Sequence, residues 1–146
     1  MSTAEPLYLA DTSAWVKTRQ RSTPSAVRER FATLVRAGRI LICDVVALEL
    51  LHHEDRPERF RQRRADLGVL ARAATNDSAT ARAVEVMELL ATRGGGAHRG
   101  PSTADYLVAA AAELAGATVL HYDRDYDAIA AVTGQPVAWL APRGTI

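Results

Sequence analysis

The chain has 146 residues, of which 48% are hydrophobic and 24% are charged, and its formal net charge at pH 7 is +1. These values are typical of a globular domain with its own buried core, and we predict that residues 1–146 form a single domain. The polar start MSTAEP is unlike a signal peptide, and no apolar run reaches the roughly 18 residues of a membrane span. One cysteine, Cys43, excludes an internal disulfide, and we expect a cytoplasmic protein with no membrane association.

Four short apolar runs have the character of buried strands. They are LYLA, ILIC, TVLH and PVAWL, at 7–10, 40–43, 118–121 and 136–140. Helical periodicity or a helix-start residue marks the segments between them, and we predict helices that begin at Ser13, Thr23-Pro24, Asp44, Pro57, Asp77, Pro101-Ser102 and Asp123. The run GGGAHRG at 94–100 is predicted to be a flexible loop without regular structure.

Strands that alternate with helices and are apolar on both faces predict an α/β fold. We expect a three-layer α/β/α domain with a short, mostly parallel sheet of four to five strands. In open parallel sheets, ligands bind beyond the carboxyl ends of the strands. The residues that follow the predicted strands are therefore the first candidates for a site.

Acidic residues follow each of the first three predicted strands and would meet at one edge of the sheet. They are Asp11 after the first strand, Asp44 and Glu49 after the second, and Asp123 and Asp125 after the third, and a further acid, Asp105, lies in the first turn of a helix.

Each of these acids also has a structural interpretation. Asp44 is more simply a helix cap, Asp105 stands three residues after Ser102 as in a capping box, and Asp123 can cap the last helix. Glu49 is harder to explain in this way, because it lies on an apolar helix stripe where a partly buried carboxylate needs a cation or donors. The joint placement of the acids, more than any one of them, indicates a site.

A group of carboxylates suits a divalent cation. Carboxylates held close together repel one another unless a cation compensates their charge. Oxygen ligands favour Mg²⁺ or Mn²⁺, and such ions also bind phosphate, polarise it and activate water. The acids therefore favour metal-dependent phosphodiester hydrolysis over acyl transfer.

Four segments in a fixed order carry a resemblance to a known family. They are LADTSAW at 9–15, VVALELLHH at 45–53, ADYLVAAAA at 104–112 and HYDRDYDAIA at 121–130. This ordered set resembles the PIN-domain ribonucleases, specifically the VapC toxins of bacterial VapBC toxin–antitoxin modules. The resemblance covers almost the whole chain and is weakest over 54–100.

The resemblance implies a PIN-like fold and an endoribonuclease that cleaves RNA with one or two Mg²⁺ or Mn²⁺ ions and so inhibits translation and growth. It implies metal ligands at Asp11, Glu49, Asp105 and Asp123, with Asp125 as the nearby fifth acid. Family members differ in which of the last two acids contacts the metal. Ser13, and less surely Thr12, would orient an acid or a metal-bound water by hydrogen bonding.

The family also implies partners. We expect a homodimer that is inhibited by a VapB antitoxin, in a hetero-oligomer that can bind operator DNA. Arginines would hold the RNA backbone or meet acidic antitoxin residues, and the candidates are the cluster at 56–64 and Arg99. Tyr106, Tyr122 and Tyr126 are candidates to stack on RNA bases, although Tyr126 fits a packing role equally well.

Two other enzyme or signalling classes do not fit. A haloacid-dehalogenase-like phosphatase needs D-x-D after the first strand, where this chain has Asp11-Thr12-Ser13, and a receiver domain needs a lysine after a late strand, whereas the only lysine is Lys17. One alternative stays open, namely a protein that acts mainly as a binding partner in a toxin–antitoxin repressor complex with little nuclease activity. The sequence does not indicate whether transfer, ribosomal or messenger RNA is cleaved.

Overall fold

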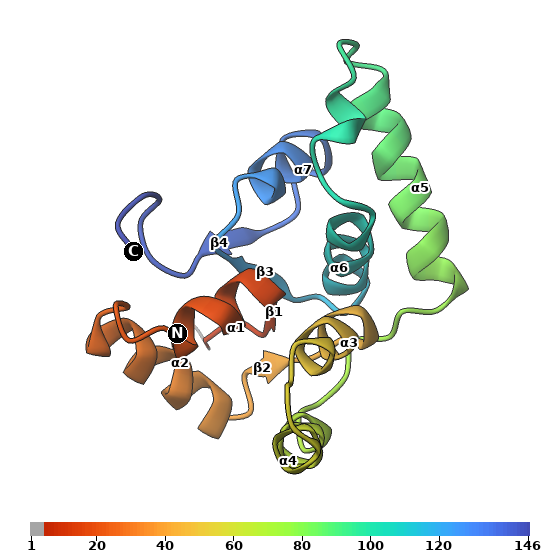
Figure 1. Cartoon of the computed structure of the whole chain (residues 1–146). Coiled ribbons are helices and arrows are strands. Elements are labelled where there is room, and N and C mark those ends of the chain that lie inside the picture. The colour runs from red at the N-terminus through yellow and green to blue at the C-terminus, as the bar shows by residue number, and fades with distance from the viewer. Residues whose placement is uncertain (1–4) are drawn as a thin grey trace.

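The structure is a computed structural model that describes residues 5–146 (Figure 1). Its strands are β1 (Tyr8–Ala10), β2 (Ile40–Leu41), β3 (Thr118–His121) and β4 (Val137–Trp139). Its helices are α1 (Thr12–Arg19), α2 (Ser25–Arg36), α3 (Asp44–His52), α4 (Pro57–Gly68), α5 (Asp77–Ala91), α6 (Thr103–Leu114) and α7 (Asp125–Thr133), with a 3₁₀ turn, η1 (Ala97–Arg99). The expectation about a signal peptide concerns MSTAEP, of which residues 1–4 lie outside the described part.

The strands form one sheet in the order β2-β1-β3-β4, and every neighbouring pair is parallel. In the register, Tyr8 lies beside both Ile40 and Thr118, and Val119 lies beside Val137. The prediction of a short, mostly parallel sheet of four to five strands is confirmed, and the sheet of the described residues is parallel throughout.

The strand order places helices on both faces of the sheet. The connection from β1 to β2 crosses the sheet in one direction, and the connections from β2 to β3 and from β3 to β4 cross it in the other. Because such crossovers are right-handed, α1 and α2 lie on one face, and α6 and α7 lie on the opposite one. Figure 1 shows this arrangement, with α5 packed outside α6, and the three predicted layers are confirmed.

The same order creates a crevice between β1 and β3. These neighbours are the two central strands, and the chain leaves them in opposite directions. The crevice outside the carboxyl ends of such a pair is where open α/β sheets bind ligands. At this point the backbone N–H of Asp11 donates to the carbonyl oxygen of Leu120 over 2.9 Å, so the residue after β1 is fixed against the end of β3.

The core is built from the sheet and the inner helices. Leu9, Ile42 and Val119 have no exposed surface. On α6, Val108 and the four alanines Ala109–Ala112 are exposed by 2% or less. Alanine side chains let a helix axis come close to the sheet, so α6 brings its first turn directly to the edge of the crevice.

Three predicted helix starts are wrong, and the third, at Asp123, is described with the site below. Asp11, and not Ser13, is the N-cap of α1, and its side chain accepts from the backbone N–H of Ser13. Cys43, and not Asp44, is the N-cap position of α3, and the carboxylate of Asp44 pairs with an arginine instead. The N-cap is the residue whose side chain reaches a free backbone N–H of the first turn. A sequence pattern locates this residue only to within one or two positions.

The segment 94–100 contains more regular structure than predicted. Gly94, Gly95 and Gly96 have φ values of +80°, +66° and +72°, a left-handed conformation that glycine adopts without a steric cost. They reverse the chain after α5 and lead into the 3₁₀ turn η1. Among the helices of residues 5–146, we find none that is long and apolar enough to cross a membrane.

Candidate active site

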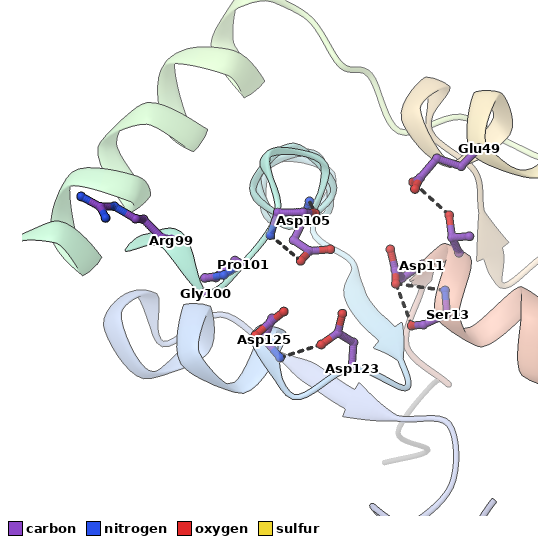
Figure 2. A pocket seen from close by; sticks show the side chains of 11 residues that line it. Asp11, Ser13, Glu49, Arg99, Gly100, Pro101, Asp105, Asp123 and Asp125 are labelled. Atoms are coloured by element: carbon purple, nitrogen blue, oxygen red, sulfur yellow. Dashed lines mark hydrogen bonds between the residues drawn. The ribbon is translucent and has the colours of Figure 1, made fainter. Parts of the chain in front are cut away.

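An open pocket of about 540 Å³ lies at the crevice between β1 and β3. Five carboxylates line it, and they come from four separate segments of the chain: Asp11, Glu49, Asp105, Asp123 and Asp125. Figure 2 shows their side chains around one hollow. The spatial expectation from the sequence, that these acids share one site, is met by their positions, whereas Asp44 does not line the pocket.

Asp11 is held by several hydrogen bonds at the end of β1. Its Oδ2 accepts from the backbone N–H of Ser13 at 3.1 Å and from the Ser13 hydroxyl at 2.7 Å. The Ser13 Oγ accepts in turn from the backbone N–H of Tyr122 at 2.9 Å, which joins the ends of β1 and β3. Ser13 therefore fixes an acid by hydrogen bonding, as the resemblance implies.

Glu49 reaches the pocket from α3, on the far side of Asp11. The Thr12 hydroxyl donates to its Oε1 at 3.0 Å, and Figure 2 shows this bond between α1 and α3. Glu49 is half-buried, as its apolar neighbours in the sequence predict. Thr12 and Ser13 are consecutive residues, so the start of α1 orients two of the five acids.

Asp105 is placed by the N-terminus of α6. The Ser102 hydroxyl accepts from the backbone N–H of Asp105, and Asp105 Oδ2 accepts from the backbone N–H of Ser102 at 2.9 Å, so the predicted capping box is confirmed. The pKa of Asp105 is raised to about 6, mainly by burial; the charges of Asp11 and Asp123 also raise it, and the Ser102 hydrogen bonds lower it. The Asp105 carboxylate thus caps α6 and also lines the pocket.

Asp123 and Asp125 lie on the tight turn between β3 and α7. The N-cap position of α7 is Arg124, so the prediction that Asp123 caps this helix is wrong. The Asp123 carboxylate accepts instead from the backbone N–H of Asp125 at 2.9 Å. Burial raises the pKa of the Asp125 carboxyl, and the adjacent charge of Asp123 adds to this effect.

Three of the acids are close enough to share one ion. Asp105, Asp123 and Asp125 each offer a carboxylate oxygen, and these oxygens lie within 4.8 Å of one another. Asp11 and Glu49 line the same pocket but do not belong to this closest group. The donor set consists of carboxylate oxygens alone, and this chemistry fits Mg²⁺ or Mn²⁺ and not a soft metal.

Within residues 5–146, no cationic side chain forms an ion pair with the five acids. Among residues 5–146, six ion pairs form between arginines and acids, and none of them involves a carboxylate of the pocket. Arg99 lies at the rim, and Figure 2 shows its guanidinium directed away from the acids. The arginines of 56–64 do not line the pocket at all, so the crevice is an uncompensated concentration of negative charge.

Two of the three tyrosines named as base-stacking candidates are buried, whereas the third, Tyr122, is half-buried. Tyr106 is exposed by 1% and Tyr126 by 0%, so neither ring can reach an RNA base. The Tyr106 hydroxyl donates to the carbonyl of His98, and the Tyr126 hydroxyl donates to Asp11 Oδ1 at 2.8 Å. Burial raises the pKa of Tyr126 well above its usual value, so its hydroxyl keeps its proton. Sequence reasoning missed this contact because it joins residues 115 positions apart.

Comparison with known proteins agrees with this fold and pocket. The PIN domain family matches residues 8–132, from the start of β1 almost to the end of α7. The chain is therefore a PIN-domain protein.

Individual relatives identify the family within the PIN-domain proteins. Ribonuclease VapC18 of Mycobacterium tuberculosis is 40% identical over 140 residues, which are 96% of this chain and 99% of that protein. Ribonuclease VapC51 of the same organism is 37% identical over 95% of this chain and 96% of that protein. The chain belongs to the VapC ribonuclease family.

Solved structures share the fold at lower sequence identity. The DNA-bound VapBC complex of Salmonella typhimurium matches with a TM-score of 0.73 and 19% identity, over 94% of this chain and all of that chain. FitAB bound to a DNA fragment matches with a TM-score of 0.68 and 17% identity, over 92% of this chain and 95% of that chain.

Proposed function

We propose that the protein is a metal-dependent endoribonuclease that acts as the toxin of a VapBC-type toxin–antitoxin pair. The observation that carries the proposal is the pocket of five carboxylates that no arginine, lysine or histidine of residues 5–146 neutralises. Negative charge of this density repels RNA, so the site needs a divalent cation before a phosphodiester can enter it. The relatives named as VapC ribonucleases give the proposal its substrate class.

Asp11, Glu49, Asp105, Asp123 and Asp125 would hold Mg²⁺ or Mn²⁺, and the oxygens of the last three lie closest together. When bound, such an ion supplies charge for the phosphate oxygens and a strong nucleophile from water at neutral pH. We expect the products to carry 5′-phosphate and 3′-hydroxyl ends.

The residues of the chain would orient and bind. Ser13 holds Asp11, and Thr12 holds Glu49, so that both carboxylates face the pocket. Arg99 is exposed at the rim, where its guanidinium can contact an RNA phosphate beside the acids and not between them. The carboxylates at the centre of the pocket would thus bind the cation, and Arg99 at the rim would bind the nucleic acid.

Partners follow from the same class. Solved relatives with this fold are complexes of VapC with VapB or of FitB with FitA, some of them on DNA. We propose a VapB-like antitoxin as the inhibitor and operator DNA as a target of the complex. A homodimer remains a prediction.

The test is a matched pair of aspartate variants in one turn of the chain. Asp123→Asn removes a carboxylate of the site but keeps a side-chain oxygen for the backbone N–H of Asp125, so the fold should persist. Metal catalysis contributes several kcal/mol, so we expect RNA cleavage to fall about 100-fold or more and growth arrest on expression to be relieved.

The control is Asp127→Asn, an exposed acid of the first turn of α7 that does not line the pocket. It should cleave RNA and arrest growth like the unaltered protein, and sequencing of RNA 5′ ends after induction would identify the target. Equal toxicity of Asp123→Asn and the unaltered protein would contradict the nuclease and favour a protein that acts mainly in a repressor complex.

A further inference from the structure

Tyr126 is buried next to the carboxylate pocket, and its hydroxyl contacts Asp11. Tyr126 lies in the first turn of α7, directly after Asp125, and has no exposed surface. Its hydroxyl is 2.8 Å from Asp11 Oδ1. An ionised carboxylate only accepts hydrogen bonds, so the phenol is the donor.

The acceptor positions of Asp11 are almost fully used by the protein. A carboxylate has about four lone-pair positions, two on each oxygen. The backbone N–H and the hydroxyl of Ser13 occupy those of Oδ2, and the Tyr126 hydroxyl occupies one on Oδ1. One lone-pair position on Oδ1 accepts no hydrogen bond from residues 5–146. A cation would bind Asp11 at this position, so its direction is fixed.

The ring of Tyr126 is itself locked. It packs against His121, with the ring centroids 5.0 Å apart and the planes at 37°. His121 Nδ1 accepts from the backbone N–H of Asp123 at 3.1 Å. Tyr126 therefore contacts Asp11, at the end of β1, through its hydroxyl. Through its ring it contacts His121, which in turn holds the backbone of Asp123.

We propose that Tyr126 is a positioning residue that orients Asp11 for divalent-cation binding through the hydrogen bond to Oδ1. The inference rests on the proposed metal site and adds to it a buried donor. Donors that hold a metal ligand in place commonly change metal affinity 10–100-fold when they are removed. Phenylalanine at this position would fill the same space and remove only the hydroxyl.

The test is Mn²⁺ binding by isothermal titration calorimetry on the whole protein, without RNA. Tyr126→Phe should bind Mn²⁺ about 10-fold more weakly, at the lower end of that range because Ser13 still holds the other oxygen. Tyr8→Phe is the matched control, because the Tyr8 hydroxyl also donates to a carboxylate, that of Glu5, at the opposite end of β1. This control should bind Mn²⁺ like the unaltered protein.

A double variant separates orientation of Asp11 from a general loss of structure. In an Asp11→Ala background the hydroxyl has no carboxylate to orient, so Tyr126→Phe should not weaken Mn²⁺ binding further. Urea unfolding in EDTA gives the stability of each variant independently. Unchanged Mn²⁺ affinity of Tyr126→Phe, or an equal loss in both backgrounds, would overturn the inference and leave the proposed function intact. An unaltered protein that binds no Mn²⁺ would overturn the proposed function itself, and this inference with it.

Discussion

At the scale of single residues, the site combines acids that are already committed to the backbone. Asp11 caps α1, Asp105 belongs to the capping box of α6, and Asp123 accepts from the backbone N–H of Asp125. Backbone donors fix the carboxylates before any ligand arrives, so their repulsion cannot be relieved by rotation of the side chains. The burial that raises the pKa of Asp105 to about 6 is one result of this arrangement.

The raised pKa of Asp105 predicts how stability depends on pH. The pKa of about 6 in the folded state exceeds the ordinary aspartate value of 3.8, so the folded state binds this proton more tightly than the unfolded state. The resulting stabilisation is complete below about pH 4 and is lost as the pH rises through about 6. Asp105→Asn keeps an oxygen for Ser102 and carries no charge, so its stability relative to the unaltered protein should increase by about 1 kcal/mol from pH 5 to pH 8.

This prediction is checked by urea unfolding at the two pH values in EDTA. Asp44→Asn serves as the control, because Asp44 is exposed and lies outside the pocket. A difference between Asp105→Asn and the unaltered protein that is the same at pH 5 and pH 8 would contradict a buried, repelled carboxylate.

The sequence identified the five acids but not all of their hydrogen-bond partners. Asp11, Asp123 and Asp125 are recognisable because they follow short apolar strands, and Glu49 and Asp105 because they match segments of the family. Tyr126 carries no such mark, since its role depends on the tertiary contact between its hydroxyl and Asp11. The arginines of 56–64 do not line the pocket, and their role in binding RNA or an antitoxin stays a prediction.

At the scale of elements, the sequence of α6 satisfies both its own helix cap and its packing in the core. Its capping box could be predicted from Ser102 and Asp105 alone, and its alanines predict a buried helix. Strands were located within a residue or two because apolar runs mark them clearly. The 3₁₀ turn at Ala97–Arg99 could not be predicted, because three glycines permit many paths and tertiary contacts select one.

The cap of α6 predicts a graded effect of substitution at Ser102. Ser102→Ala removes the acceptor for the backbone N–H of Asp105 and should lower the free energy of unfolding by about 1 kcal/mol. Activity should fall as well, because the first turn of α6 positions Asp105. Ser102→Thr keeps the hydroxyl and should retain most of both, and urea unfolding with an RNA cleavage assay checks the pair. A threonine variant as impaired as the alanine variant would show that the hydroxyl is not what matters.

At the scale of the whole molecule, the strand order decides where the site lies. The order β2-β1-β3-β4 brings the ends of β1 and β3 together, and these strands are more than 100 residues apart in the sequence. Periodicity predicts the class of fold, but it does not state which strands are neighbours. Which strands are neighbours is seen only in the structure.

A pocket with uncompensated charge predicts that a divalent cation stabilises the entire fold. A ligand at about 100 times its dissociation constant adds about 2.7 kcal/mol to the stability of the folded state. For a protein of this size, we expect Mn²⁺ to raise the melting temperature by about 5–10 °C at pH 8. Calorimetry with Mn²⁺ and with EDTA measures this shift. Asp123→Asn should reduce it, and an unchanged melting temperature of the unaltered protein in excess Mn²⁺ would count against the metal site.

The distribution of the acids along the chain has a consequence during synthesis. Asp11 is added to the growing chain more than 100 residues before Asp123 and Asp125, which follow the second central strand β3. Until β3 has paired with β1, the nascent polypeptide has no crevice in which these carboxylates can meet. Any activity that depends on the carboxylate pocket therefore waits until the chain through Asp125 has been made and β3 has paired with β1.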